Sequence, residues 1–159
     1  MILKYKKVRP TGIAPEFKTA HAAGMDFHAS LEGISNNVLG KGDREFILMP
    51  GQWYSIPLGI AVQLEPGYEL QMRPRSGLAN NYGIGMVNSP GTIDADYTGE
   101  VHAILINYSK APFIIHEGDR ICQGVVKSVE TPDTGLEMEE VDELDETERG
   151  EKRFGHTGV

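Results

Sequence analysis

The stretch "GTIDADYTGE", residues 91–100, places two carboxylates and an aromatic ring between glycines, just before an apolar run. On an extended chain, residues two apart point to the same face, so Asp94 and Asp96 would share one face. Ile93, Ala95 and Tyr97 would then lie on the other. One carboxylate is thereby free to face a ligand, although aspartates at a tight bend also serve the turn itself by bonding their own backbone.

A second candidate is "RPRSGLA", residues 73–79, which begins a helix that we predict from Ser76 to Tyr82. Arg75 offers a guanidinium fork, Ser76 a hydroxyl that can also cap the helix, and Gly77 an accessible N–H, a combination suited to phosphate. A capped helix beside a surface arginine is the alternative. GxxxxGK[ST] and GxGxxG loops are absent, so a phosphate site here is of another design.

Metal and covalent chemistry leave weaker signals. The five histidines lack HxxxH and HExxH spacing, and Cys122 is the only cysteine, which excludes a zinc site built on paired cysteines. We expect Cys122 to be a buried core residue. No GxSxG nucleophile motif occurs. Mg²⁺ held mainly by the phosphates of a ligand needs only one or two protein carboxylates, so magnesium stays possible.

The elements that would position these groups are strands. The chain has 19 glycines and nine prolines at short intervals, which disfavours long helices. A period of two puts one set of residues on a single face: Tyr54, Ile56, Leu58, Ile60, Val62 and Leu64. The turn at 65–67 leads to a second alternating run with Leu70 and Met72, which predicts a hairpin. With further apolar runs at 100–107 and 121–129, we expect an all-β sandwich, jelly roll or barrel with one short helix.

Size and charge narrow the classes of function. A chain of 159 residues suits one domain, and a net charge of −8 argues against nucleic acid or anionic membrane as a partner. Without a long apolar run or an apolar leader segment, we expect a soluble, cytoplasmic protein. Residues 137–148 include eight acidic side chains, and the basic, glycine-rich "RGEKRFGHTGV" follows. Such a tail is either a disordered end or a segment that closes over an anionic ligand.

Five segments, read in order, resemble the motifs of the trimeric dUTPase family: "AAGMDF", "RPRSGLA", "NSPGTIDADYTGE", "GDRICQGVV" and "RGEKRFGHTG". They extend from Ala22 to Gly158. The resemblance implies a distorted all-β jelly roll over residues 1–136, assembled as a homotrimer with active sites between subunits. Residues 137–159 would form an acidic connection and a C-terminal arm that closes over a neighbouring subunit's site.

The resemblance also implies a reaction: dUTP is hydrolysed to dUMP and pyrophosphate by attack of water on the α-phosphorus. The reaction limits uracil in DNA and supplies dUMP for thymidylate synthesis. Asp94 matches the carboxylate that activates the water. Tyr97 matches the ring that packs on the deoxyribose and excludes a 2′-hydroxyl, and Asn88 with the hairpin backbone from Gly91 matches the positions that read uracil.

For the triphosphate, the resemblance implies a set of lining residues: Arg75, Ser76, Gly77 and Gln123. Asp26 would support the hydration shell of Mg²⁺, the implied cofactor, which is held mainly by the substrate phosphates. In the arm, Phe154 matches the aromatic residue that stacks on uracil and Arg149 the arginine that reaches the γ-phosphate. The rest of the arm's substrate-binding set is Gly155, His156 and Thr157.

Two departures from the family pattern stand out. Where the arm of the family reads RGxGGFGSTG, this chain has Lys152 and Arg153 in place of two glycines and His156 in place of serine. The stretch 33–44 resembles a surface insertion. Two alternatives remain open: a nucleotide-switched regulatory protein with an unknown protein partner, and a dCTP deaminase. Deamination needs a glutamate at the base, where this chain carries the aspartate of "TIDADY".

Overall fold

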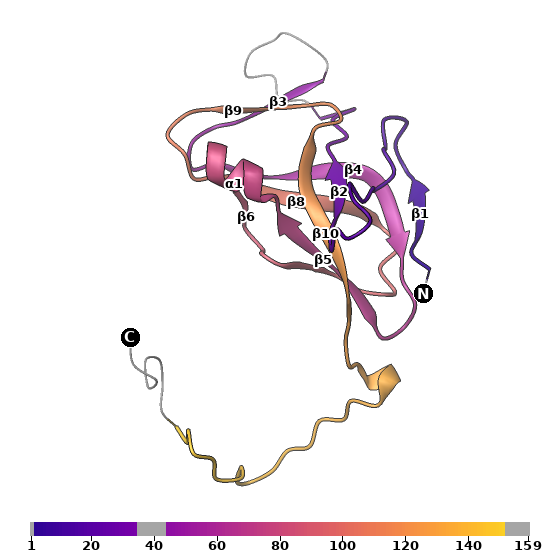
Figure 1. Ribbon diagram of the computed structural model, residues 1–159, viewed down its shortest axis with the longest axis vertical. Coiled ribbons are helices and arrows are strands. Elements are labelled where there is room, and N and C mark those ends of the chain that lie inside the picture. The colour runs from indigo at the N-terminus through magenta and orange to yellow at the C-terminus, as the bar shows by residue number, and fades with distance from the viewer. Residues whose placement is uncertain (1, 35–43, 152–159) are drawn as a thin grey trace.

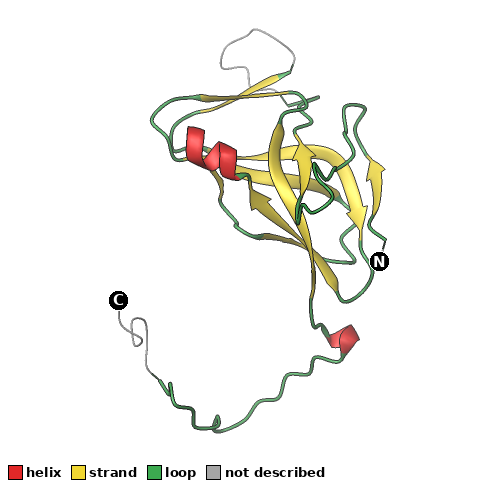
Figure 2. Cartoon of the chain, viewed as in Figure 1, coloured by secondary structure: helices red, strands yellow, loops and turns green. Residues whose placement is uncertain are grey.

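The computed structural model describes residues 2–34 and 44–151, and within them the chain is built mainly of antiparallel strands (Figures 1 and 2). The strands are β1 (Lys4–Lys7), β2 (Met25–His28), β3 (Glu45–Leu48), β4 (Trp53–Gln63), β5 (Tyr68–Pro74), β6 (Ile84–Met86), β7 (Gly91–Ile93), β8 (Glu100–Asn107), β9 (Phe113–His116) and β10 (Arg120–Ser128). One α-helix, α1 (Ser76–Tyr82), and a short 3₁₀ turn, η1 (Pro132–Thr134), complete the described elements.

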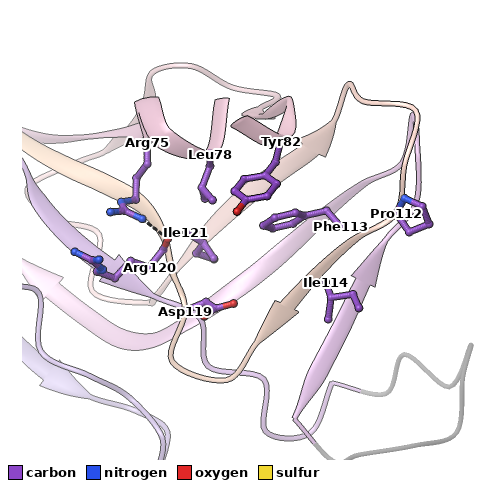
Figure 3. Close-up of a pocket in the computed structure, with 9 residues that line it drawn as sticks. All are labelled: Arg75, Leu78, Tyr82, Pro112, Phe113, Ile114, Asp119, Arg120 and Ile121. Atoms are coloured by element: carbon purple, nitrogen blue, oxygen red, sulfur yellow. Dashed lines mark hydrogen bonds between the residues drawn. The ribbon is translucent and has the colours of Figure 1, made fainter. Parts of the chain in front are cut away.

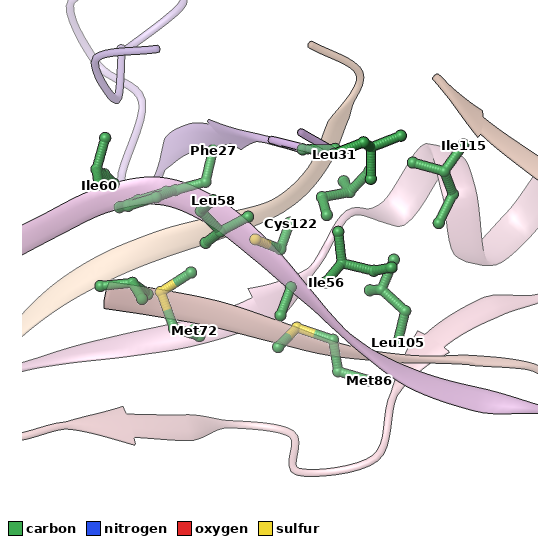
Figure 4. Close-up of a cluster of buried hydrophobic side chains, with 14 of the residues drawn as sticks. Phe27, Leu31, Ile56, Leu58, Ile60, Met72, Met86, Leu105, Ile115 and Cys122 are labelled. Carbon is green, nitrogen blue, oxygen red and sulfur yellow. The ribbon is translucent and has the colours of Figure 1, made fainter. Parts of the chain in front are cut away.

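Two four-stranded sheets carry the fold, one in the order β1-β4-β8-β6 and the other in the order β2-β10-β5-β7, and β3 pairs with β9. The inner faces of both sheets supply one apolar core (Figure 4). Phe27, Ile56, Leu70 and Leu105 are each at most 1% exposed, and burying a side chain of this size stabilises the fold by roughly 1.5–3 kcal/mol. The all-β, jelly-roll prediction is confirmed.

The predicted hairpin between residues 53–64 and 68–73 is wrong. β4 pairs with β1 and β8, whereas β5 pairs with β10 and β7, so the turn at 65–67 carries the chain from one sheet to the other. The apolar side chains of β4 and β5 enter the same core from different sheets instead of lying side by side in one sheet. Alternation in the sequence therefore identified the strands and their inner faces but not their partners.

The strict alternation expected along β4 also fails at its centre, where seven consecutive residues, 56–62, are buried. The outer face there is covered by two loops. Ser30 N donates to Pro57 O at 2.9 Å, and Val8 N donates to Gly59 O at 2.9 Å. Gly59 has a φ of 69°, and a Cβ at Gly12 would lie 2.2 Å from Gly59 O, so the backbones meet too closely for side chains.

The helix is found where it was predicted, but its cap differs. Arg75 is the N-cap, with no hydrogen bond from its side chain to the helix backbone, and Ser76 is the first helical residue. The helix ends at Gly83, which adopts a φ of 66° and donates its N–H to Ala79 O at 3.1 Å. A left-handed residue at this position suits glycine, and it turns the chain directly into β6.

After β10 the chain leaves the body of the fold and runs outward (Figure 1). Every residue from 132 to 151 is exposed, and beyond η1 this stretch contains neither helix nor strand. The eight carboxylates of residues 137–148 thus lie in solvent, where their mutual repulsion costs little. Within the described ranges, no helix is long and apolar enough to cross a membrane.

Candidate functional site

Asp26 links the two arginines at the ends of neighbouring strands. Its Oδ1 accepts a hydrogen bond from Arg75 Nε at 3.1 Å and its Oδ2 one from Arg120 Nη1 at 3.0 Å. Arg75 Nη1 also donates to the backbone carbonyl of Arg120 at 2.9 Å. The side chain of Asp26 is 14% exposed and that of Arg75 is 26% exposed, so solvent screens this network only in part. We call these three residues the arginine cluster.

Strand register brings the cluster together. In the β2-β10-β5 sheet, Gln123 pairs with Asp26 on one side and with Arg73 on the other. Gln123 Nε2 donates to Pro74 O at 2.9 Å, which holds the amide next to the cluster. A Cβ at Gly24 would lie 2.6 Å from Gln123 Oε1, so the glycine of "AAGMDF" leaves the room that this amide needs.

Beside the cluster lies an open depression of about 510 Å³ between α1, β9 and β10 (Figure 3). Arg75 and Arg120 stand at one end, and the rings of Tyr82 and Phe113, with centroids 5.3 Å apart, stand at the other. Leu78 lies between them. Sequence reasoning missed Arg120, although it belongs to the quoted "GDRICQGVV", because nothing in that motif says which carboxylate it meets.

The predicted phosphate-binding residues belong to this cluster or lie next to it in the chain or the sheet. Ser76 and Gly77 lie exposed in the first turn of α1, directly after Arg75. Arg75 uses Nε and Nη1 within the chain, and among the described residues no acceptor is hydrogen-bonded to its Nη2. A guanidinium held in this way presents its remaining donors in a fixed direction, an arrangement suited to binding an anion.

The second group of predicted residues lies on the turn after β7. Tyr97 N donates to Asp94 O at 3.2 Å, so the chain bends between these residues. Ile93 and Ala95 pack against the core while Asp94 and Asp96 are exposed, as the alternating pattern predicts. Tyr97 departs from that pattern and is 44% exposed, because the bend at 94–97 ends the alternation before it reaches the ring.

The hairpin implied by the resemblance, which carries Asn88 and Tyr97, is not formed by paired neighbouring strands, because β7 pairs with β5 and β8 pairs with β4 and β6. Asn88 is exposed in the connection between β6 and β7, and a Cβ at Gly91 would lie 2.8 Å from Asn88 Nδ2. The two residues predicted to read a base are thus neighbours. Residues 88–100 are called the Asp94 segment below.

The surroundings of Asp94 are acidic. A depression of about 820 Å³ is lined by five carboxylates, those of Glu69, Asp94, Asp96, Glu130 and Asp133. None of the described residues that line it is cationic. A triphosphate therefore finds no compensating charge there, and the cations it needs must come from another part of the molecule or from another copy.

The arginine cluster and Asp94 lie at opposite ends of β5. Leu70 pairs with Ile93, so Asp94 follows opposite Glu69, which is six residues before Arg75. At ~3.3 Å per residue, the strand separates Asp94 from Arg75 by about 20 Å. One chain therefore brings together Asp26, Arg75 and Gln123 but holds Asp94 apart from them, whereas Gly91, which pairs with Met72, lies between the two along β5.

An ion pair stabilises the end of the Asp94 segment. Arg9 Nε donates to Glu100 Oε1 at 2.5 Å, and Gly59 N donates to the same oxygen at 3.0 Å. Hydrogen bonding to Glu100 raises the pKa of Arg9. Burial acts to raise the pKa of Glu100, but the hydrogen bonds from Arg9 and Gly59 and the charge of Arg9 outweigh it, so that pKa is lowered.

Two other titratable groups are buried beside the arginine cluster. Cys122 is fully buried, as predicted, and burial raises the pKa of its thiol, so the residue is an inert part of the core. His28 is 7% exposed, and burial lowers its pKa although Glu16 and Asp26 act in the opposite direction. Among the described residues no group of three or more potential metal ligands exists.

The predicted arm is only partly within the described residues. Arg149 is exposed, at the end of the acidic stretch. Gly150 and Glu151 are exposed as well, and residues 152–159 lie outside the described ranges, among them Lys152, Arg153, Phe154, Gly155, His156 and Thr157. The insertion at 33–44 likewise falls outside, except for Gly33, Ile34 and Arg44.

The chain matches known proteins over most of its length. The dUTPase family model matches residues 41–158. A deoxyuridine 5′-triphosphate nucleotidohydrolase of Caldanaerobacter subterraneus subsp. tengcongensis is 46% identical over 145 residues, covering 91% of this chain and 88% of that protein.

Two solved structures share the fold. A mutant dUTPase of Staphylococcus bacteriophage 80alpha, solved with dUpNHpp, has a TM-score of 0.83 at 23% identity and covers 99% of both chains. A mutant dUTPase from phage phi11 of S. aureus, described with a structural Mg(II) ion, has a TM-score of 0.74 at 20% identity and covers 92% of this chain and all of that one. With the family model spanning most of its length and a relative at nearly half identity, this chain belongs to the dUTPase family.

Proposed function

We propose that this chain hydrolyses dUTP to dUMP and pyrophosphate at a site that two or more copies build together. One observation carries the proposal: the cationic groups suited to the triphosphate and the carboxylate suited to activating water lie about 20 Å apart along β5. A general base must be within hydrogen-bond reach of the water that it deprotonates. Asp94 of one copy must therefore meet the arginine cluster of another.

The acidic surroundings of Asp94 support the same conclusion. Five carboxylates around an open depression disfavour a polyphosphate unless cations arrive from outside. Arg75 and Arg120 of a second copy supply such cations. A homotrimer with cyclic symmetry satisfies this requirement. Each site then combines the arginine cluster of one subunit with Asp94 of the next, and all three sites are complete.

Asp94 is the residue that activates the attacking water in this proposal. It is exposed and follows β7, which pairs with β5 and packs Ile93 against the core, so the backbone that carries Asp94 is anchored while its carboxylate faces solvent. Water attacks the α-phosphorus and passes a proton toward Asp94, while the bond to the β-phosphate oxygen breaks and pyrophosphate leaves with those electrons.

Arg75, Ser76, Gly77 and Gln123 form the phosphate side of the site. Arg75 is held by Asp26 and by the carbonyl of Arg120, and Gln123 is held by Pro74, so the donors are oriented before substrate binds. Preorganised donors stabilise the charge that accumulates on the leaving pyrophosphate without reorganising during the reaction.

Asn88 and the backbone near Gly91 read the uracil edge, and Tyr97 packs on the deoxyribose. A polar edge that pairs with uracil leaves unpaired groups against cytosine, which is how such a site rejects the wrong base. From the arm, Arg149, Phe154, Gly155, His156 and Thr157 complete the binding of substrate by closing over the site.

The described residues fit Mg²⁺ as a partner of the substrate rather than as a metal bound by a protein cage. Both oxygens of Asp26 already accept from arginines, and each carboxylate oxygen has further lone pairs that can hold a metal-bound water. When bound, Mg²⁺ neutralises charge on the triphosphate. Asp26 would orient its waters while keeping Arg75 in position.

Neither alternative gains support. The matched family model and the reported relative are dUTPases, and the base-reading segment carries Asp94 where deamination needs a glutamate. Nothing in the described residues identifies a protein partner for a regulatory role. The hydrolase is therefore the function that both the residues and the comparisons favour.

A mixing experiment tests whether the site is shared. Asp94→Asn and Arg75→Ala chains, each inactive alone, are unfolded together and refolded, and pyrophosphate release from dUTP is measured. If the two residues come from different copies, mixed assemblies contain some sites with both native residues, and we expect a substantial fraction of native activity. Activity no higher than that of the separate variants would show that both residues act from one chain.

The substrate itself is tested with the native protein. We expect pyrophosphate release with Mg²⁺ from dUTP, and little from dCTP, dTTP or UTP at the same concentration. Equal release from all four would contradict the assignment of base and sugar recognition to residues 88–97. Binding of dUTP without release would contradict the hydrolase and favour the nucleotide-switched regulatory role.

A further inference from the structure

Gly99 lies directly beneath the ring of Tyr97. A Cβ built on Gly99 would be 2.6 Å from the phenol oxygen, 2.7 Å from Cζ and 3.1 Å from Cε2 of Tyr97. Contacts this short force one of the two groups to move. Gly99 does not have a positive φ, so the backbone here would accept any residue, and it is the ring that requires a glycine.

The ring is also fixed at its far end. Tyr97 Oη donates a hydrogen bond to the backbone carbonyl of Glu100 at 2.8 Å, which folds the side chain back over residues 99–100. Nevertheless 44% of Tyr97 remains exposed. The residue therefore rests on the chain while offering part of its surface to whatever binds there.

The peptide that receives the phenol is itself firmly held. Glu100 Oε1 accepts from Gly59 N and from Arg9 Nε, and Glu100 Oε2 accepts from Arg9 Nη2 at 3.1 Å. Arg9 Nη1 donates to Glu32 O at 2.6 Å. The fork of Arg9 thus ties the start of β8 to the loop after β2, and Gly59 N ties it to β4, so the carbonyl under the phenol has little freedom to follow a displaced ring.

We propose that Gly99 determines sugar specificity, because its missing side chain sets the height of the Tyr97 ring against the deoxyribose. The inference rests on the proposed function, in which Tyr97 packs on that sugar. Gly99 is a positioning residue that acts through Tyr97 and does not itself touch the substrate. Alanine at this position lifts the ring off the chain toward the sugar, where contact is tightest for the correct substrate.

The selectivity for dUTP over UTP reports on this height. In Gly99→Ala we expect kcat/KM for dUTP to fall at least tenfold, while the already low value for UTP changes little, so that their ratio falls. Loss of stability or of active enzyme lowers both values equally and leaves the ratio intact. The ratio thus separates a displaced ring from a damaged fold.

Gly85→Ala is the matched control. Gly85 lies beneath another tyrosine, with a Cβ expected 2.8 Å from Cε2 of Tyr108, and it too has no positive φ. Tyr108 is 69% exposed and belongs to neither half of the proposed site. The same kind of clash at this position should leave the ratio of dUTP to UTP hydrolysis unchanged. An equal fall in this control would overturn the proposal.

Tyr97→Phe provides a second measurement that keeps Gly99. It removes the hydrogen bond to Glu100 O and the atom closest to the missing Cβ, so we expect the ratio to fall on the order of threefold. In this background, Gly99→Ala should cost less than it does beside tyrosine, because the two changes act on the same contact. If the effects of Tyr97→Phe and Gly99→Ala on the ratio were strictly additive, the proposal would be contradicted. This comparison of ratios holds even if Gly99→Ala alone folds poorly.

The outcomes distinguish this inference from the proposed function. If the native chain and Gly99→Ala discriminate dUTP from UTP equally well, only the role of Gly99 is contradicted. A native chain that hydrolyses both nucleotides equally, or neither of them, would sink the sugar-reading role of Tyr97 and this inference with it.

Discussion

The arginine cluster and the Asp94 segment differ in how complete a single chain makes them. In the cluster, both oxygens of Asp26 are engaged and Gln123 is held by a backbone carbonyl. In the Asp94 segment, Asp94 and Asn88 are exposed. The first region is hydrogen-bonded within the chain and the second is exposed. In the proposed function, the chain therefore prebuilds the binding of charge and leaves the carboxylate of Asp94 open to another copy.

The largest effect is expected from Asp94→Asn. Because the proposed function gives this exposed carboxylate a role in the reaction and none in the fold, we expect kcat for dUTP to fall by about 10²–10⁴ with the melting temperature unchanged. Steady-state kinetics and thermal unfolding at one protein concentration measure the two quantities. Asp96→Asn, the neighbouring exposed carboxylate, is the control and should retain most of the rate.

A large loss of stability in Asp94→Asn would break the comparison, because it would show that the carboxylate is part of the folded network. A loss of dUTP affinity as large as the loss of rate would show instead that Asp94 binds substrate. Either result would mean that Asp94 belongs to the part of the site that a single chain forms by itself.

The second prediction concerns Asp26→Asn, for which we expect the opposite balance. The neutral amide keeps the size of the side chain but weakens its hydrogen bonds to Arg75 and Arg120, so the free energy of unfolding should fall by about 1–3 kcal/mol. KM for dUTP should rise as well, because Arg75 loses its orientation. Denaturant unfolding and kinetics on one preparation measure both effects.

For comparison, Glu69→Gln changes a carboxylate on the same strand, β5, that lies near Asp94 instead. It should leave both the stability and KM close to native values. If Asp26→Asn were as stable as the native chain, the arginine cluster would be no more prebuilt than the Asp94 segment.

The sequence predicted most of the pieces but not their arrangement. Glycines, prolines and the alternation of apolar residues are signals that depend only on nearby sequence. For this reason α1 and the strands at 100–107 and 120–128 were predicted with nearly correct bounds. The candidate site residues were predicted from motifs, because a motif specifies the residue type at each position. Sheet membership could not be read, because alternation marks the buried face of a strand and not its neighbour. The hairpin error at 65–67 follows from this limit.

Long-range pairs were missed for the same reason. Arg120 meets Asp26 only because β10 and β2 pair in one register, and Arg9 meets Glu100 across 91 residues of sequence. The clearance that Gly99 leaves for Tyr97 depends on a side-chain rotamer, which a motif does not encode. What sequence reasoning lacked was therefore register and rotamer, the two properties that decide which groups touch.

The smallest expected effect lies at the base of the Asp94 segment and tests whether this half-site is anchored at all. The pKa of Glu100 is lowered from its ordinary value of 4.5, so the folded state favours the charged form. The resulting stability is fully present above about pH 4.5 and is lost as the pH falls through the lower folded-state value. Because the pair with Arg9 is partly exposed, its contribution should stay below ~1 kcal/mol.

Glu100→Gln should therefore melt slightly below the native protein at pH 7, and the two melting temperatures should converge as the pH falls below about 4.5. Thermal unfolding from pH 7 to pH 3 at fixed protein concentration measures this. Glu140→Gln, in the exposed acidic stretch, should follow the native curve at every pH. A constant gap between Glu100→Gln and the native protein would mean that Glu100 contributes through packing, and the anchor beneath Tyr97 would then be steric and not electrostatic.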